Sequence, residues 1–437
     1  MKSILSFGLV ALIYLHSAAY ANNGKMRCHH CTPHGKYPAI ESVHSEELVP
    51  GIRHVEFAVK VGKGKYDKIT LHRIVRENRF GRAARTRDAV MMVHGDAYGF
   101  DSFIASVNSQ VVPQDQSIAI QMAKAGIDVW GIDLRWTAVP ASETDLSFMA
   151  DWDMKTDLAD LDTALRIARK IRHLRGNRNS KLNLLGWSRG GQLGYLYLAR
   201  ESQLVAARRN IKGFIPVDIA IKTDNDDIRQ AACLRQAAYQ AQIDAGQYAD
   251  NSGLILQSVS LLAQAQPDEP SPIVDGFTNQ QTMLLFLSAT FSLTPGVAET
   301  PWYHYNAAIF DNYGLPAMLA FSNPDYLHEY ALGVAAYEPA NIYMQGAGLL
   351  CDSTDYAFDD HLQDIRVPIL YVYAAGGFGK AGIYSAQMTA SRDVSIAGVQ
   401  TLPDEYAAAD FGHVDLFTAD NAGELVWSKI INWIQAH

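Results

Sequence analysis

From His54 onward, short β-rich runs alternate with amphipathic helical segments, and this alternation restricts the possible folds more than any other feature. Strands that alternate with helices are typical of a mostly parallel sheet whose faces are covered by helices. The first two runs, 54–61 and 68–75, are separated only by the short segment GKGKYD. We therefore predict an α/β fold whose mostly parallel sheet begins with a hairpin.

Two segments carry the clearest patterns of this kind. The run 89–95, AVMMVHG, is continuously apolar before its glycine, as expected of a strand buried on both faces. Between 153 and 175, apolar residues recur at spacings of three and four, which predicts a long amphipathic helix that ends at Gly176. Further strands are predicted at 127–135, 182–185, 211–222 and 367–377, and further helices before Gly126, at 192–202 and at 424–434.

The alternation stops between Thr223 and Asp364. This stretch is rich in alanine, glutamine and aromatic residues and has few strand-like runs, so we predict a large, mostly helical insertion. The predicted organisation is a leader (1–21), an N-terminal extension (22–51), a first core part (52–222), the insertion (223–364) and a second core part (365–437).

The first 21 residues resemble a signal peptide. Lys2 gives a positive start, residues 4–15 are apolar, and Ala19-Tyr20-Ala21 fits a cleavage site. A membrane anchor is the weaker alternative, because no apolar run reaches the roughly 20 residues that a spanning helix needs. We expect an exported protein, secreted or periplasmic, without stable membrane insertion.

The net charge and the cysteines restrict the partners and cofactors that we expect. The formal net charge is -9 and no basic block is present, so nucleic acid is not an expected partner. In an oxidising compartment, Cys233 and Cys351 could join the two ends of the insertion in a disulfide. Cys28 and Cys31 lie in CHHCTPHGK, where a metal or redox site is an alternative to a local disulfide or a loose loop. We favour a local disulfide or a loose loop, since no second pair of ligands follows at the spacing of a zinc finger. We expect no metal and no cofactor.

A serine lies between two glycines in GWSRGG, directly after the strand predicted at 182–185. This motif places Ser188 on a tight strand-to-helix turn, where the close approach of the backbone favours glycine at 186 and 190. The turn directs the amide of Arg189 toward a developing oxyanion, and the helix dipole favours negative charge there. Ser188 is therefore predicted to be a catalytic nucleophile, the alternative being a glycine-rich turn that contains a serine by chance.

From about His54 to His437, the chain resembles the α/β-hydrolase superfamily. The matching segments are MMVHGDAYG, GIDVWGIDLRW, GWSRGG and DFGHVDLF, in the order that this fold requires. The resemblance implies that the insertion is a cap. It also implies that His94 and Gly95 lead into an oxyanion loop, in which the amide of Asp96 is the second donor. The role of His94 is then to hold this loop in place.

The resemblance further implies a general base late in the chain, and His413 in FGHVDLF fits that place. The acid usually follows the strand predicted at 367–377, but residues 374–380 contain no Asp or Glu. Some members carry it one strand earlier, which corresponds to Asp218 after FIPV and keeps the order Ser, Asp, His. The alternatives are Asp224, Asp226 and Asp227 and, less favoured, Asp404 and Asp410 on the histidine's own loop; Asp133, Arg135 and Asp415 are expected to be structural.

The insertion supplies an expectation about the substrate, because its aromatic residues suit the roof of an apolar pocket. They are Phe286, Phe291, Trp302, Tyr303, Tyr305, Phe310, Tyr313, Phe321, Tyr326 and Tyr330, about half of which we expect to serve only the insertion's own core. The leading hypothesis is an exported hydrolase of carboxylic esters, whose substrate is hydrophobic and either a small molecule or a polymer. The alternatives are a serine peptidase or amidase of the same fold and a catalytically inactive binding protein.

Overall fold

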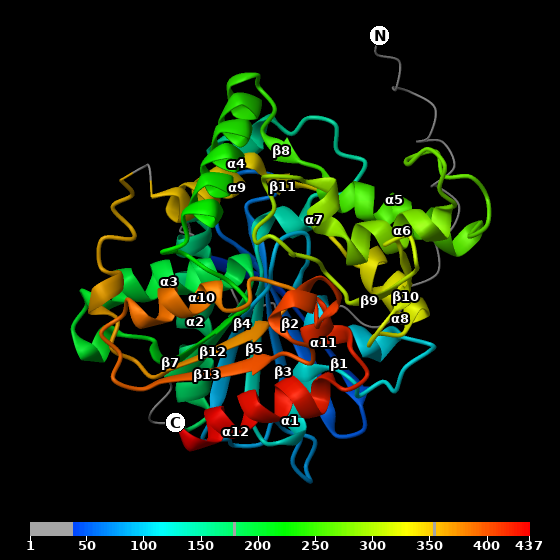
Figure 1. Ribbon diagram of the computed structural model, residues 1–437. Coiled ribbons are helices and arrows are strands. Elements are labelled where there is room, and N and C mark those ends of the chain that lie inside the picture. Colours follow the sequence, from blue (N-terminus) through cyan, green and yellow to red (C-terminus); the bar gives the residue numbers. More distant parts are fainter. Residues whose placement is uncertain (1–37, 178–180, 353–354) are drawn as a thin grey trace.

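The computed structural model describes residues 38–177, 181–352 and 355–437 (Figure 1). The predicted signal peptide, Cys28 and Cys31 lie outside these residues. The centre of the described chain is a nine-stranded sheet with the order β1-β2-β3-β5-β4-β6-β7-β12-β13. Its strands are β1 (Ala39–Val49), β2 (Ile52–Lys60), β3 (Lys68–Arg76), β4 (Ala89–Val93), β5 (Asp128–Asp133), β6 (Leu182–Trp187), β7 (Ile211–Val217), β12 (Ile369–Ala374) and β13 (Val394–Val399).

The sheet has an antiparallel edge and a parallel remainder. Strands β1, β2 and β3 pair antiparallel, and β3 pairs antiparallel with β5. From β5 to β13 every neighbouring pair is parallel. The predicted hairpin and the mostly parallel sheet are therefore confirmed.

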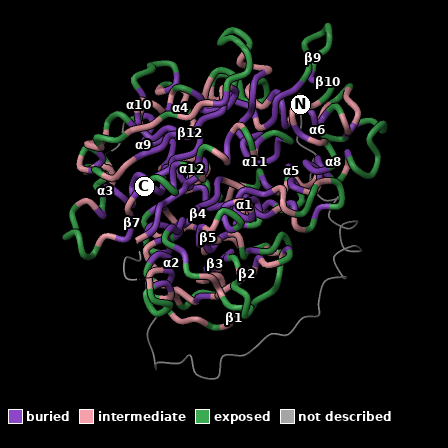
Figure 2. Tube along the Cα trace, turned by 90° about the horizontal axis from the view of Figure 1, so that it is seen from below, coloured by how far each residue is buried: buried purple, intermediate pink, exposed green. Residues whose placement is uncertain are grey.

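Sequence analysis missed the two outermost strands. Strand β1 lies in the segment expected to be an N-terminal extension, and β13 lies between β12 and the loop of His413. Nearly all residues of both strands are half-buried or exposed, as Figure 2 shows for β1. An edge strand of this kind lacks the continuous apolar run by which buried strands are predicted.

Strand β4 shows why the central strands are continuously apolar. Its five residues are all buried. Met91 and Val93 belong to the core on one face of the sheet, and Val90 and Met92 belong to the core on the other face. Successive side chains of a strand point to opposite faces, so a strand covered on both sides needs an apolar residue at every position.

Helices cover the two faces. The core that contains Met91 also contains residues of α2 (Met154–Leu174), α3 (Arg189–Ser202) and α10 (Ala381–Gln387). The core that contains Val90 contains residues of α1 (Ile118–Lys124), α11 (Asp415–Thr418) and α12 (Ser428–Ala436), the last preceded by a π-helical turn (Gly423–Trp427). Helix α2 confirms the predicted long helix, and the Asp153 carboxylate caps it by accepting from the Thr156 amide at 2.9 Å.

The insertion is mostly helical, as predicted, and lies above the carboxyl ends of the parallel strands (Figure 1). Its helices are α4 (Asp226–Asp244), α5 (Ser252–Ala265), α6 (Asn279–Ser288), α7 (Thr290–Leu293), α8 (Pro324–Leu332) and α9 (Ala340–Cys351). Two small ribbons join them: β8 (Ala249–Asp250) with β11 (Glu338–Pro339), and β9 (Ala308–Phe310) with β10 (Pro316–Leu319). Among the described residues, no helix combines the length and apolarity needed to cross a bilayer.

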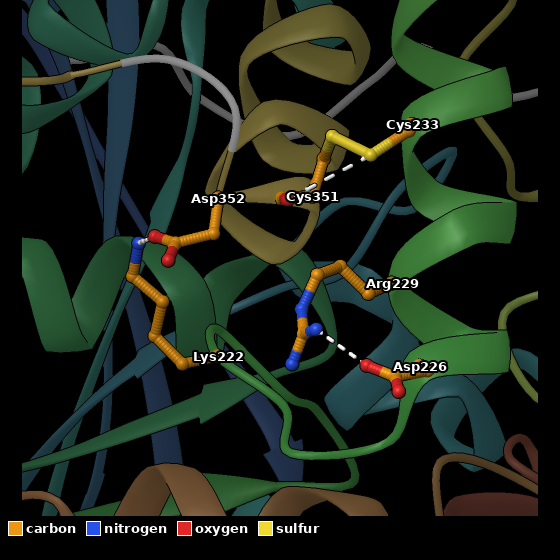
Figure 3. The surroundings of a disulfide bond; sticks show 6 residues. All are labelled: Lys222, Asp226, Arg229, Cys233, Cys351 and Asp352. Carbon is orange, nitrogen blue, oxygen red and sulfur yellow. Dashed lines mark hydrogen bonds and ion pairs between the residues drawn. A yellow bond between two sulfur atoms is a disulfide. The ribbon is translucent and has the colours of Figure 1, made fainter.

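A disulfide joins Cys233 on α4 to Cys351 at the end of α9, as the sequence suggested (Figure 3). The two cysteines are 118 residues apart, so the bond closes most of the insertion into one loop. Helices α4 and α9 pack along each other, and the ion pair between Lys222 and Asp352 lies beside the bond. The disulfide therefore fixes the two ends of the cap against each other.

Replacing both cysteines, Cys233→Ser with Cys351→Ser, is expected to lower the free energy of unfolding by about 2–5 kcal/mol, because the denatured chain loses a long-range constraint. Urea unfolding of the double variant and the parent protein measures the difference. A change below about 0.5 kcal/mol would show that the cap does not depend on this bond.

Candidate active site

The turn between β6 and α3 holds Ser188 in a conformation that few side chains adopt. Its backbone lies at φ 53° and ψ -126°, and its amide donates to the Val217 carbonyl at 2.9 Å. A Cβ at Gly186 would lie 2.2 Å from the Gly190 carbonyl oxygen, and one at Gly190 would lie 2.3 Å from the Val93 carbonyl oxygen. Only glycine fits at either position, so the two glycines permit the strained turn that raises Ser188 above the end of the sheet.

Asp218 and His413 form a buried pair beside this turn. Asp218 follows β7 with φ 47°, and its carboxylate lies 2.6 Å from Nδ1 of His413. The two side chains are 0 % and 4 % exposed. Trp187 stacks on the imidazole at 5.3 Å between ring centroids, and Tyr303 contacts it at the same distance. The packing and the carboxylate together fix the orientation of the ring.

The loop after β12, where the superfamily usually carries its acid, binds the carboxylate of Asp218 instead. The amides of Ala374, Phe378 and Gly379 donate to this carboxylate at 3.1–3.2 Å. A Cβ at Gly377 would lie 1.8 Å from Oδ2 of Asp218. The absence of a side chain at Gly377 therefore makes room for an acid that arrives from β7.

The two residues predicted to supply oxyanion donors also form an ion pair through their side chains. The guanidinium of Arg189 donates twice to the carboxylate of Asp96, at 2.8 and 3.0 Å. Burial by itself lowers the pKa of Arg189, but the Asp96 carboxylate raises it above its usual range, so the guanidinium stays protonated. The sequence did not predict this pairing, because residues 93 positions apart meet only when the loop after β4 lies beside the start of α3.

The cap holds both of these residues from above. Arg189 donates to the Ile342 carbonyl at 3.1 Å and stacks over the ring of Tyr343, both on α9. The amide of Ala97, next to Asp96, donates to the buried carboxyl group of Glu338 on β11. Burial, followed by the nearby charge of Asp96, raises the pKa of Glu338 well above its usual value. Cap residues therefore fix the backbone around the predicted oxyanion donors.

The remaining residues singled out in the sequence lie in supporting positions. His94 is buried, accepts from the Leu134 amide at 3.3 Å and contacts Trp136 edge-on, while a Cβ at Gly95 would lie 2.9 Å from that of Ser188. Arg135 pairs with Asp160, at 2.8 Å through two donors, and with Asp67 at 2.7 Å.

The other aspartates considered for the acid lie away from the imidazole. Asp226 is exposed and pairs with Arg229, and Asp404 pairs with Lys380. Asp410 accepts from the amides of Thr401 and Leu402. Asp415 accepts from the Gly412 amide at 2.9 Å and so braces the loop of His413, as expected.

Ser188 and His413 open onto one cavity of about 340 Å³ between core and cap. Asp96 and Arg189 line it as well. Of the ten cap aromatics named from the sequence, only Phe286, Tyr303 and Tyr305 lie in its wall, and Tyr239 and Tyr343 add two that the sequence analysis did not name. Of the others, Tyr330 packs against Tyr98 and Phe321 against Phe411, whereas Trp302 and Tyr313 are exposed.

Replacing Gly377 by alanine is expected to lower the free energy of unfolding by about 1–3 kcal/mol, because the new methyl group would overlap the Asp218 carboxylate. The matched control is Gly333→Ala, where the nearest atom to a Cβ is 3.4 Å away, and a change within about 0.5 kcal/mol is expected. Denaturant unfolding of both variants checks this. Equal effects would mean that Gly377 is not required for the position of Asp218.

No protein-family model and no curated protein matches the sequence. Among solved structures, a candidate lipase from Sulfolobus solfataricus is 19% identical, with a TM-score of 0.61 over 88% of this chain and 95% of that one. A soluble variant of the monoglyceride lipase of Saccharomyces cerevisiae is 12% identical with a TM-score of 0.43, over 92% and 97% of the two chains. A thermophilic esterase from Thermogutta terrifontis is 15% identical with a TM-score of 0.40, over 87% and 98%. The first similarity, together with the strand order and the capped parallel sheet, shows that this chain has the α/β-hydrolase fold.

Proposed function

We propose that this protein is an exported serine hydrolase that cleaves carboxylic esters of a hydrophobic substrate. The observation that carries the proposal is the Asp218–His413 hydrogen bond of 2.6 Å beside Ser188, in one cavity between core and cap. A buried carboxylate that orients an imidazole next to a serine on a strained turn is the arrangement that serine hydrolases require. Export is supported by the disulfide Cys233–Cys351 and by the composition of the first 21 residues.

In the proposed reaction, Ser188 attacks the ester carbonyl and His413 accepts the proton of the hydroxyl group. Asp218 keeps Nδ1 of His413 protonated, so that Nε2 is free to act as the base, and it stabilises the imidazolium that forms. The amides of Asp96 and Arg189 donate to the oxyanion. His413 then protonates the leaving alcohol. In the second step, His413 takes a proton from water, which attacks the acyl group, and returns the proton to Ser188 as the carboxylic acid leaves.

The cavity wall supports a substrate with a bulky apolar part. Besides its aromatic residues, the cap contributes the aliphatic side chains of Ile255, Leu256, Leu293 and Leu350. The charged groups in the wall are paired: Asp96 with Arg189, and Arg235 with Glu299 at 2.5 Å. A cavity with paired charges and apolar walls favours burial of an acyl chain or ring over binding of a charged group.

A substrate panel separates this proposal from the peptidase and amidase alternative. We expect the protein to hydrolyse p-nitrophenyl esters and to leave aminoacyl and prolyl amides intact. The reverse preference would exclude the esterase function. The inactive-binding alternative predicts that a fluorophosphonate probe does not label Ser188.

Asp218→Asn is expected to reduce turnover by up to about ten-thousand-fold, because an asparagine amide no longer stabilises the correct tautomer and the charged form of His413. Ester hydrolysis is measured alongside Ser188→Ala, which should remove labelling by the probe. Asp404→Asn is the control, since this carboxylate pairs with Lys380 at the surface and should leave activity within about twofold. An active Asp218→Asn enzyme would assign the acid to another residue.

Arg189→Met is expected to lower kcat by roughly ten- to a hundredfold with a smaller effect on KM, because it leaves the Asp96 carboxylate unpaired beside the developing oxyanion. The double variant Asp96→Ala with Arg189→Met removes that charge and should regain part of the loss. Steady-state kinetics of the parent, Arg189→Met, Asp96→Ala and the double variant form a double-mutant cycle. Additive losses would mean that the side-chain pair has no part in stabilising the transition state.

A further inference from the structure

The antiparallel edge of the sheet carries a cluster of imidazole and carboxylate groups that the proposed hydrolysis does not use. His54 and Glu56 are two residues apart on β2, so both side chains point to one face. His72 on β3 lies directly opposite Glu56, and Glu46 on β1 lies directly opposite His54. Three neighbouring strands therefore bring two imidazoles and two carboxylates together on a single face.

The distances within this cluster match those between ligands of one ion. One potential ligand atom from each of His54, Glu56 and His72 lies within 4.8 Å of the others. Nε2 of His54 and Nδ1 of His72 are 3.0 Å apart, and Nδ1 of His72 is 3.8 Å from the Glu56 carboxylate. Two imidazole nitrogens bound to one tetrahedral zinc ion are separated by about 3.3 Å. Binding of an ion would require the two nitrogens to separate by a few tenths of an ångström and both rings to turn toward a common point.

A carboxylate holds the outer nitrogen of His72. Nε2 of His72 lies 2.9 Å from Asp133 at the end of β5, where the carboxylate accepts its proton, and Nδ1 points toward Nε2 of His54. Histidines that bind metals typically donate their other ring N–H to a carboxylate, which fixes the tautomer and the ring. Phe100 stacks on the same imidazole at 4.5 Å and restricts its rotation further.

His54 supplies a second, independent observation. Its side chain is 3 % exposed, and its Nδ1 has no hydrogen-bond partner. This nitrogen faces the Glu46 carboxylate at 3.7 Å, beyond hydrogen-bond distance. An imidazole whose Nε2 binds a metal ion carries its proton on Nδ1, which could then donate toward Glu46.

We propose that His54, His72 and Glu56 bind a divalent transition-metal ion, with Zn²⁺ as the best match to two imidazoles and one carboxylate. Asp133 and Glu46 orient the two imidazoles, and the fourth position is left for water. The sequence predicted no metal site here, because the ligands come from different strands and no short spacing motif marks them.

The same contacts connect this cluster to the loop of the candidate active site. The carboxylate of Asp133 that accepts from His72 also accepts from the Phe100 amide at 2.6 Å. Phe100 follows the segment that holds Asp96 and Ala97. A bound ion would therefore stabilise the start of that loop as well as the edge of the sheet.

The test uses the chain from Asn22 onward with Cys28→Ser and Cys31→Ser, so that the N-terminal cysteines cannot supply ligands. After treatment with a chelator, titration calorimetry with Zn²⁺ is expected to show one ion per chain and thermal unfolding a higher Tm with the ion. Glu56→Gln, at a half-exposed position that should tolerate the change, is expected to weaken binding at least tenfold. His361→Gln, a surface histidine paired with Asp364, is the control and should bind within about twofold of the parent.

Cobalt(II) provides a spectroscopic measurement that does not depend on enzyme activity. The parent protein should show the intense visible absorption of four-coordinate Co²⁺, and His72→Gln should lose it. If His72→Gln does not fold, the Glu56→Gln titration decides the matter by itself. Absence of stoichiometric Zn²⁺ binding, or equal affinity of the parent and Glu56→Gln, would overturn the proposal.

Discussion

The carboxylate of Asp218 is the group on which the carboxyl edge of the parallel sheet depends. It follows β7, is fully buried, and accepts from the amide of Ala374 at the end of β12, from two amides of the loop after it and from His413. A buried carboxylate without such partners would be costly, so its hydrogen bonds determine how the β12 loop and the histidine loop approach each other. Gly377 is part of the same requirement, because any side chain there would occupy the place of the carboxylate.

A second set of contacts makes the cap part of the site and not only its roof. Arg189 joins the start of α3 to Asp96 and to the Ile342 carbonyl of α9, and Glu338 of β11 accepts from the Ala97 amide. The disulfide Cys233–Cys351 holds the ends of the cap together at the other end of α9. The position of the proposed oxyanion donors thus depends on segments that lie more than 100 residues apart in the chain. Because the guanidinium of Arg189 pairs with the Asp96 carboxylate, a charged residue is compatible with the position of an oxyanion donor.

Much of the fold could be predicted because its signals are local. Continuous apolar runs predicted β4 and β12, the spacing of Leu158, Leu161 and Leu165 predicted α2, and GWSRGG predicted the turn of Ser188. The strands at the edges, β1 and β13, escaped because their residues are half-exposed and follow no strong pattern. The sequence also showed that the usual acid position holds no carboxylate, which favoured Asp218 as the acid.

The sequence by itself determined the class of fold, the mostly helical insertion and the short set of residues from which an acid, a base and a nucleophile could come, because periodicity and turn motifs depend on neighbouring residues. Only the tertiary structure decided which aspartate meets His413, that Asp96 pairs with Arg189, and that His54, Glu56 and His72 share one face of the sheet. Each of these contacts joins different elements, and their geometry follows from strand order and register, which local sequence patterns do not specify.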